Sequence, residues 1–114
     1  MPVNKELLKG SAQTIVLKLL SRKDMYGYQI VQELGETSEG GFELTEGTLY
    51  PLLHALETDG AVEAYWDESQ GARKRKFYRI TTRGKKLLKQ KHEEWESFRS
   101  AMELVLTTKY GGLA

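Results

Sequence analysis

The sequence predicts a mainly α-helical fold with a small two-stranded antiparallel β-wing, in the α+β class. Two neighbouring stretches predict it. Residues 46–59 have the periodicity of a helix between a capping residue and a glycine, and residues 62–80 have the composition of two short strands joined by a turn. A helix followed directly by a basic hairpin is the arrangement of a winged helix-turn-helix, in which the helix enters a DNA major groove.

The helix at residues 46–59 has a clear start and end. Thr45 is a residue type that caps helix N-termini, and Gly60 suits the position after a helix, where φ turns positive. Pro51 removes a backbone hydrogen bond, so we expect an irregular first turn. The pattern alone is equally consistent with an ordinary core helix, and the hairpin that follows favours a recognition helix. The apolar face consists of Leu49, Leu52, Leu53 and Leu56, and the candidate DNA contacts are Thr45, Thr48, Tyr50 and His54.

The hairpin is strongly basic on its second strand. Its tip is expected at residues 69–72, and four consecutive cations follow, which makes both faces of the strand positive in either register. Cross-strand pairing with Glu63, Asp67 and Glu68 is the alternative use of these charges. Because five basic residues, Arg79 included, exceed three acidic ones, we favour phosphate binding. The candidate phosphate contacts are Arg73, Lys74, Arg75 and Lys76.

A first helix is expected over residues 4–20. Its apolar pattern is wide, and a helix apolar over more than a third of its circumference usually packs against two neighbours. We therefore assign Leu8 and Ile15 to contacts with a second subunit. Lys9 breaks the stripe on the outer side and is a candidate phosphate contact.

A second helix is expected from a cap at Asp24 to about Leu34. Tyr28, Ile30, Val31 and Leu34 are its inward candidates. Tyr26 lies near its N-terminal end, where backbone N–H groups favour a phosphate. Packing of Tyr26 on the core, with its hydroxyl in water, is the equal alternative. Residues 35–44 are rich in glycine and acidic residues and are expected to form a loop.

A long last helix is expected from a cap at Thr81 or Thr82 to about Thr107. Residues 88, 91, 95, 98, 102 and 105 follow the spacing of a coiled-coil seam, although Lys91 and the short length argue against a self-standing coiled coil. Its apolar surface exceeds what the small lobe covers, so we expect a homodimer. The division is a DNA-binding domain at residues 1–80 and a dimerisation helix with tail at 81–114. The interface residues on this helix are Leu88, Trp95, Phe98, Met102 and Val105.

Composition excludes several classes of function. The 114 residues carry 17 basic and 16 acidic side chains, and ten of the basic ones fall in residues 73–91, which contain no acidic residue. The chain has no cysteine and no run of about 18 apolar residues, and its first residues lack the apolar core of a signal peptide. We expect a cytoplasmic protein without membrane contact. His54 and His92 lie on different helices and no catalytic group stands out, so we expect no enzyme, cofactor or metal.

The residues resemble a known family. YGYQIVQEL, LTEGTLYPLLHALETDG and YWDESQGARKRKFYRITTRGKKLL look like PadR-type transcriptional regulators, in particular the short subclass with a single C-terminal dimerisation helix. The resemblance covers about 90 of 114 residues. It implies a homodimeric winged-helix repressor of a palindromic promoter site in double-stranded DNA, often released by a small aromatic or drug-like effector. Trp95 matches the position of a tryptophan that lines a central cavity in some members, so Trp95 and Phe98 are candidate ligand contacts; dimer packing is the alternative.

Two hypotheses follow. The first is a sequence-specific repressor, in which the wing and Tyr26 contact phosphates while Thr48, Tyr50 and His54 touch base edges or neighbouring phosphates. The second is a dimeric module for small molecules or protein partners with only non-specific DNA affinity. The sequence names neither the operator nor the regulated gene, nor does it show whether an effector exists or in which direction it acts.

Overall fold

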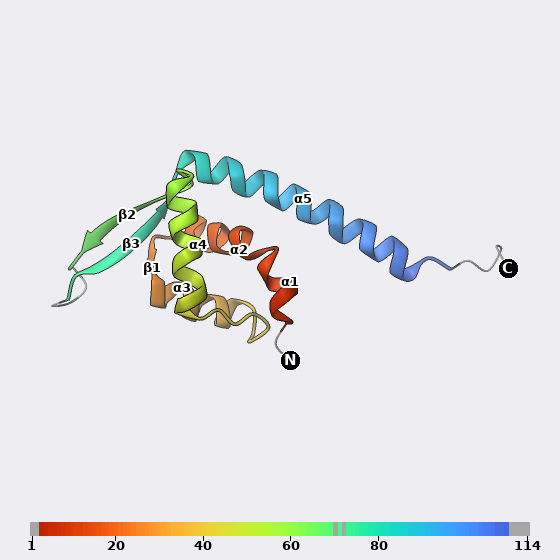
Figure 1. Ribbon diagram of the computed structural model, residues 1–114, viewed down its shortest axis with the longest axis horizontal. Coiled ribbons are helices and arrows are strands. Elements are labelled where there is room, and N and C mark those ends of the chain that lie inside the picture. The colour runs from red at the N-terminus through yellow and green to blue at the C-terminus, as the bar shows by residue number, and fades with distance from the viewer. Residues whose placement is uncertain (1–2, 70, 72, 110–114) are drawn as a thin grey trace.

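The computed structural model describes residues 3–69, 71 and 73–109. Within these residues, five helices and three short strands follow one another, and a winged lobe carries a long last helix that extends away from it (Figure 1). The lobe and this helix together measure 68 × 31 × 21 Å. The elements are α1 (Lys5–Lys9), α2 (Ala12–Arg22), β1 (Met25–Tyr26), α3 (Gly27–Thr37), α4 (Glu46–Thr58), β2 (Val62–Asp67), β3 (Arg75–Ile80) and α5 (Thr82–Thr107).

The expected first helix over residues 4–20 is two helices. The side chain of Asn4 accepts the backbone N–H of Glu6 at 2.8 Å and starts α1, which ends at Gly10. After proline, glycine is the least favourable residue in a helix, by about 1 kcal/mol relative to alanine. The helix therefore ends at Gly10, and a new helix begins after Ser11. The wide apolar pattern therefore belongs to α2, most of whose apolar residues are buried in the lobe.

The expected cap at Asp24 is wrong, because the chain first forms a strand. Met25 pairs with Tyr78 and Tyr26 with Phe77, so the sheet has three antiparallel strands in the order β1-β3-β2 rather than two. Helix α3 starts after Tyr26, whose backbone N–H donates to the Gln29 side chain at 3.1 Å. A two-residue strand is too short to leave a period in the sequence, which is why only the wing strands were expected.

The helix predicted at residues 46–59 is confirmed, but without the irregular first turn expected from Pro51. Helix α4 is capped by Thr45, continues through Pro51, and ends before Gly60, whose φ is +79°. Its leucines enter the core between α2, α3 and the sheet, where burial of each contributes about 2 kcal/mol. The core consists mainly of Val16, Leu17, Leu20, Met25, Ile30, Leu34, Leu49, Leu53, Leu56, Val62, Tyr78 and Ile80. Of the expected inward residues of α3, Ile30 and Leu34 are buried, Val31 is half-buried and Tyr28 is exposed.

The wing is the hairpin of β2 and β3. Its register runs from Val62 opposite Ile80 to Asp67 opposite Arg75. Residues 70 and 72 of the expected tip lie outside the described part of the chain, as do residues 110–114 of the tail. The hairpin leaves the lobe next to the end of α4 and projects away from the free end of α5 (Figure 1).

Helix α5 starts where the prediction placed it. The Thr81 hydroxyl accepts the backbone N–H of Gly84 at 3.0 Å and donates to the carbonyl of Gly60. The first turns pack against α2 and β3, and the rest extends past the lobe (Figure 1). Phe98 and Val105 are 62% and 69% exposed on this extension. Among the described helices, none combines the length and apolar character needed to cross a membrane.

Candidate nucleic-acid interface

The solvent side of α4 carries the polar residues expected to contact DNA. The Thr45 hydroxyl accepts the backbone N–H of Thr48 at 3.3 Å, which satisfies one of the free donors at the helix start. Thr48, Tyr50 and His54 are exposed, whereas the leucines of the opposite face are buried except for the half-buried Leu52. The helix is therefore anchored on one face and presents hydroxyl, phenol and imidazole groups on the other.

Tyr50 is positioned by contact with the start of α3. A Cβ atom at Gly27 would lie 2.7 Å from the Tyr50 Cζ atom, closer than such atoms pack. Only a residue without a side chain lets the phenol ring lie across this point, and Tyr50 remains 44% exposed. Gly27 is thus a positioning residue that sequence reasoning missed, since neither composition nor periodicity marks such a contact.

The four consecutive cations of the wing are exposed. Among the described residues, no ion pair joins Arg73, Lys74, Arg75 or Lys76 to an acidic side chain. Arg75 lies over the Tyr26 ring at 4.5 Å instead. Of the cross-strand pairing that the sequence left open, the described residues show the Glu63–Arg79 pair alone, so the charges of residues 73–76 remain available to an anion.

The acidic residues near the wing have other partners. The Asp67 carboxylate accepts the backbone N–H of Ser69 at 2.8 Å, and this hydrogen bond lowers the pKa of Asp67 below its ordinary value. Glu63 accepts Nη1 of Arg79 at 3.3 Å. The Asp67 carboxylate is thus engaged at the start of the turn, and the Glu63 carboxylate is engaged with the opposite strand.

A polar cluster that the sequence did not reveal joins all three strands. The Tyr65 hydroxyl donates to Oδ2 of Asp24 at 2.6 Å, and Nε of Arg79 donates to the same oxygen at 3.3 Å. The hydrogen bond to Asp24, with a smaller contribution from burial, raises the pKa of Tyr65 above 10.0. We call Asp24, Glu63, Tyr65 and Arg79 the outer cluster. It fixes the wing against the segment that leads into α3, which is the actual role of Asp24.

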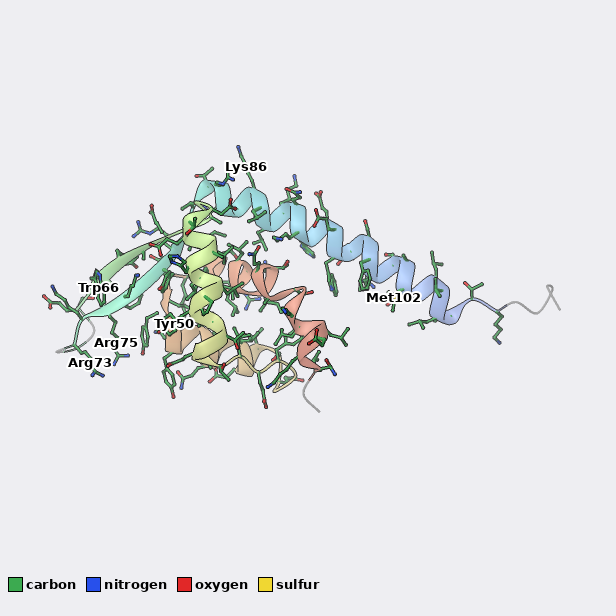
Figure 2. The ribbon with its side chains drawn as sticks, viewed as in Figure 1. Tyr50, Trp66, Arg73, Arg75, Lys86 and Met102 are labelled. Atoms are coloured by element: carbon green, nitrogen blue, oxygen red, sulfur yellow. The ribbon has the colours of Figure 1, made fainter. Side chains whose placement is uncertain are left out.

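An open cavity of about 550 Å³ lies between the wing and the starts of α3 and α4. We call it the wing cavity. In Figure 2, Arg73 and Arg75 extend from the wing on the side where Tyr50 lies on α4, and Trp66 lies above them on the wing. The cavity combines aromatic rings with cations, a composition typical of surfaces that bind nucleic acid backbones. It is lined by Tyr26, Tyr28, Tyr50, Trp66, Arg73, Lys74, Arg75 and Lys76.

The structure separates Lys9 from this surface. Lys9 is the last residue of α1, which lies across the lobe from the wing (Figure 1), and it does not line the wing cavity. The sequence predicted a phosphate contact for Lys9 because it placed Lys9 on the outer face of one helix over residues 4–20. In the structure that helix is broken at Gly10. The other nine candidate DNA contacts lie on α4, on the wing or at the start of α3.

A second cavity, of about 620 Å³, lies between α1, α2, the end of α3 and α5. We call it the α5 groove. Ile15, Leu88, Trp95 and Phe98 line it, so four of the expected interface residues share one apolar surface. Leu8 lines it too but is only 6% exposed and belongs to the core of its own protomer, so it offers little area to a second subunit. Met102 and Val105 lie further along α5 and are exposed.

Comparison with known proteins gives a consistent result. The Transcriptional regulator PadR-like family matches residues 16–90, more than half of the chain. A transcriptional regulator of Mycobacterium tuberculosis is 32% identical over 84 residues, which are 74% of this chain and 75% of that protein. The structure of a transcriptional regulator from Clostridium thermocellum is similar with a TM-score of 0.81 and 34% identity, covering 89% of this chain and 95% of that one.

A PadR family transcriptional regulator from Eggerthella lenta is similar with a TM-score of 0.79 and 33% identity, covering 91% of this chain and 88% of that one. The matched residues include α4, the wing and the first turns of α5, which are the elements that build the candidate interface. Family, fold and interface agree, and the chain belongs to the PadR-like family of DNA-binding transcriptional regulators.

Proposed function

We propose that the protein is a homodimeric repressor that binds a palindromic promoter site, and that a small aromatic effector modulates this binding. One observation carries the proposal: Tyr50, on the exposed face of α4, and the four consecutive wing cations line the same cavity. An α-helix fits the major groove, and cations beside it meet the flanking phosphates. Residues 1–80 would provide this surface, and residues 81–114 the dimer contact.

The side chains of α4 support a division of roles. Its exposed face carries Thr48, Tyr50 and His54, and no Arg, Asn or Gln. Those longer side chains are the ones that make bidentate contacts with base edges. Base readout would therefore be modest, and DNA shape and the spacing of half-sites would contribute more to specificity.

The extension of α5 supports the homodimer. Its apolar side chains lie outside the lobe and are exposed in a single protomer. Contiguous apolar surface of this kind marks interaction sites, and an isologous twofold contact would cover the same stripe on both chains. A twofold dimer would also place two recognition helices on two half-sites. Trp95, Phe98, Met102, Val105 and Leu106 form the stripe.

The α5 groove supports the effector. It is apolar, and Trp95 and Phe98 offer aromatic faces to a flat ligand. Arg99 lies over the Trp95 ring at 5.7 Å and is paired with Glu96 at 2.7 Å and Glu103 at 3.3 Å. Because the acidic partners offset its charge, Arg99 would select only weakly against cationic ligands. Packing of Trp95 in the dimer remains the alternative.

The test is titration of the purified protein with its own upstream promoter fragment and with a scrambled fragment of equal length, at two salt concentrations. We expect the promoter fragment to bind about 10³-fold more tightly or better, as specific complexes do. Equal weak binding to both fragments, combined with quenching of tryptophan fluorescence by aromatic compounds, would instead support the second function, a cytoplasmic ligand-binding module with a basic wing.

A further inference from the structure

Two aromatic residues of the wing cavity have no role in the surface proposed above. Trp66 on β2 is 64% exposed, and Tyr28 in the first turn of α3 is 51% exposed. One exposed aromatic residue is ordinary on a protein surface. Here two of them line the same cavity as four unpaired cations, so the cavity offers a ligand both apolar and charged contacts.

The register of the wing explains how Trp66 reaches the cavity. Side chains two residues apart lie on the same face of a strand, so Val62, Ala64 and Trp66 share one face of β2. This face points toward the core. Val62 is buried, Ala64 is half-buried, and Trp66 lies beyond the edge of the core, opposite Lys76. The apolar face of the wing thus continues outward as a solvent-exposed indole beside an ammonium group.

The chemistry of the cavity matches a sugar–phosphate chain. Guanidinium and ammonium groups bind phosphate, and phenol hydroxyls donate to phosphate oxygens. The indole face needs an apolar partner, and the C–H groups of deoxyribose are the apolar part of a backbone whose bases are stacked inside the duplex. Tyr50 of the recognition helix forms part of the same wall, so a duplex seated on α4 would bring its backbone into the cavity.

We propose that the wing cavity receives one sugar–phosphate segment of the DNA, with the Trp66 ring packed on deoxyribose and the Tyr28 hydroxyl donating to a phosphate oxygen. This proposal rests on the function proposed above and adds two contact residues to it. Sugar and phosphate are the same at every base pair, so these contacts strengthen binding to all sequences equally.

The test compares Trp66→Ala with Trp66→Phe on the promoter fragment and on the scrambled fragment. We expect Trp66→Ala to weaken binding to both fragments by the same factor, about tenfold, without changing the salt dependence, because no charge is removed. Trp66→Phe keeps an aromatic face and should restore most of the affinity. Tyr28→Phe should weaken binding about threefold through loss of one hydrogen bond. Unchanged melting temperatures confirm that each variant is folded.

Fluorescence provides an independent readout. The chain has two tryptophans, so the Trp95→Phe variant reports on Trp66 alone. Its emission should change on adding either fragment, and the change should be absent from Trp66→Phe. Deoxyadenosine monophosphate is the probe for a free-ligand site: if it alters Trp66 emission at micromolar concentration without DNA, the cavity binds a small nucleotide and the proposal is wrong.

The remaining outcomes separate this proposal from the function on which it rests. Wild-type affinity of Trp66→Ala for both fragments would overturn the backbone contact while leaving the promoter preference of the wild type intact. Loss on the promoter fragment alone would indicate a base contact and overturn the assignment to sugar. Equal binding of the wild type to both fragments would instead defeat the repressor function, whatever Trp66→Ala does.

Discussion

At the scale of residues, the contact between Gly27 and Tyr50 shows how a missing side chain places a functional one. The phenol ring occupies the space that any side chain at position 27 would need, so the start of α3 and the exposed face of α4 fit each other at this point. Since α3 and α4 are the paired helices of the motif, their contact sets the direction of Tyr50, for which we propose a DNA contact.

Gly27→Ala should therefore weaken promoter binding by displacing Tyr50. We expect a loss of roughly tenfold on the promoter fragment, and little further loss when Gly27→Ala is added to Tyr50→Ala, because the clash is then gone. Gly35→Ala, in the same helix with no atom within 4 Å of the new Cβ, is the matched control and should bind normally. Additive losses in the double variant would show that Gly27 does not act through Tyr50.

The Tyr65 hydroxyl should make wing stability depend on alkaline pH. Its pKa is raised in the folded protein, chiefly by the hydrogen bond to Asp24, so the bond stabilises the fold below the ordinary value of 10.0 and the contribution is lost as pH rises through the folded pKa. We expect the difference in unfolding free energy between the wild type and Tyr65→Phe to be constant near neutral pH and to shrink above about pH 10. Urea unfolding at several pH values measures it, and a difference that does not change with pH would refute the role of this bond.

At the scale of elements, the sequence predicted those with strong periodicity and caps. Helix α4 and helix α5 lie where Thr45, Gly60 and Thr81 placed them, and the wing strands follow the aromatic and β-branched pattern. The break at Gly10 was missed because the apolar spacing continues across it, and β1 was missed because two residues have no period. Propensity and pattern describe single elements, whereas these features depend on what packs against them.

The candidate site, like the fold, was predictable from the sequence in part. The exposed polar residues of α4 and the run of cations are visible in the sequence. The uses of Asp24, Gly27 and Trp66 were not, because each depends on a partner more than 20 positions away or on the register of the sheet. Tyr28 was expected to face inward on helical spacing, but α3 buries the face of Ile30 and Leu34, and Tyr28, two positions before Ile30, lies on the solvent side.

The junction between the wing and α5 should be intolerant of any side chain. A Cβ at Gly84 would clash with the backbone carbonyl of Ala61 and lie 2.7 Å from the Ile80 side chain, so backbone would have to move. We expect Gly84→Ala to lower the free energy of unfolding by about 3 kcal/mol in urea titration at fixed protein concentration. Gly47→Ala, whose nearest neighbour is 3.9 Å away, is the control and should not destabilise. Equal stability of both variants would contradict the close packing.

At the scale of the whole molecule, the winged lobe is closed around its core while α5 is not covered. The exposed apolar stripe of α5 and the α5 groove lie on the same helix, so dimer formation and effector binding would involve neighbouring surfaces. The proposed DNA surface lies on the side of the lobe away from the free end of α5, and α5 begins directly after strand β3 of the wing (Figure 1). A change in the position of α5 would therefore reach the wing through one short connection at Thr81.

Phe98→Glu should convert the protein to a monomer. Phe98 is 62% exposed in a single protomer, so the substitution should leave the lobe folded while placing a charge in the apolar stripe. Sedimentation should show half the mass of the wild type, and promoter affinity should fall by about 10²-fold or more because two half-sites no longer act together. Ser97→Glu adds the same charge beside the stripe and should remain dimeric. A dimeric Phe98→Glu variant would contradict the proposed interface.

The central claim is that α4 and the wing form one DNA surface with different roles, and comparison of Tyr50→Ala with Lys74→Ala tests it most directly. Both variants are titrated with promoter and scrambled DNA over a range of salt concentrations. We expect Tyr50→Ala to lower promoter affinity roughly tenfold with little effect on scrambled DNA. Lys74→Ala should weaken both complexes and reduce the salt slope by about 0.9. Equal losses on both DNAs for both variants would contradict the division of roles.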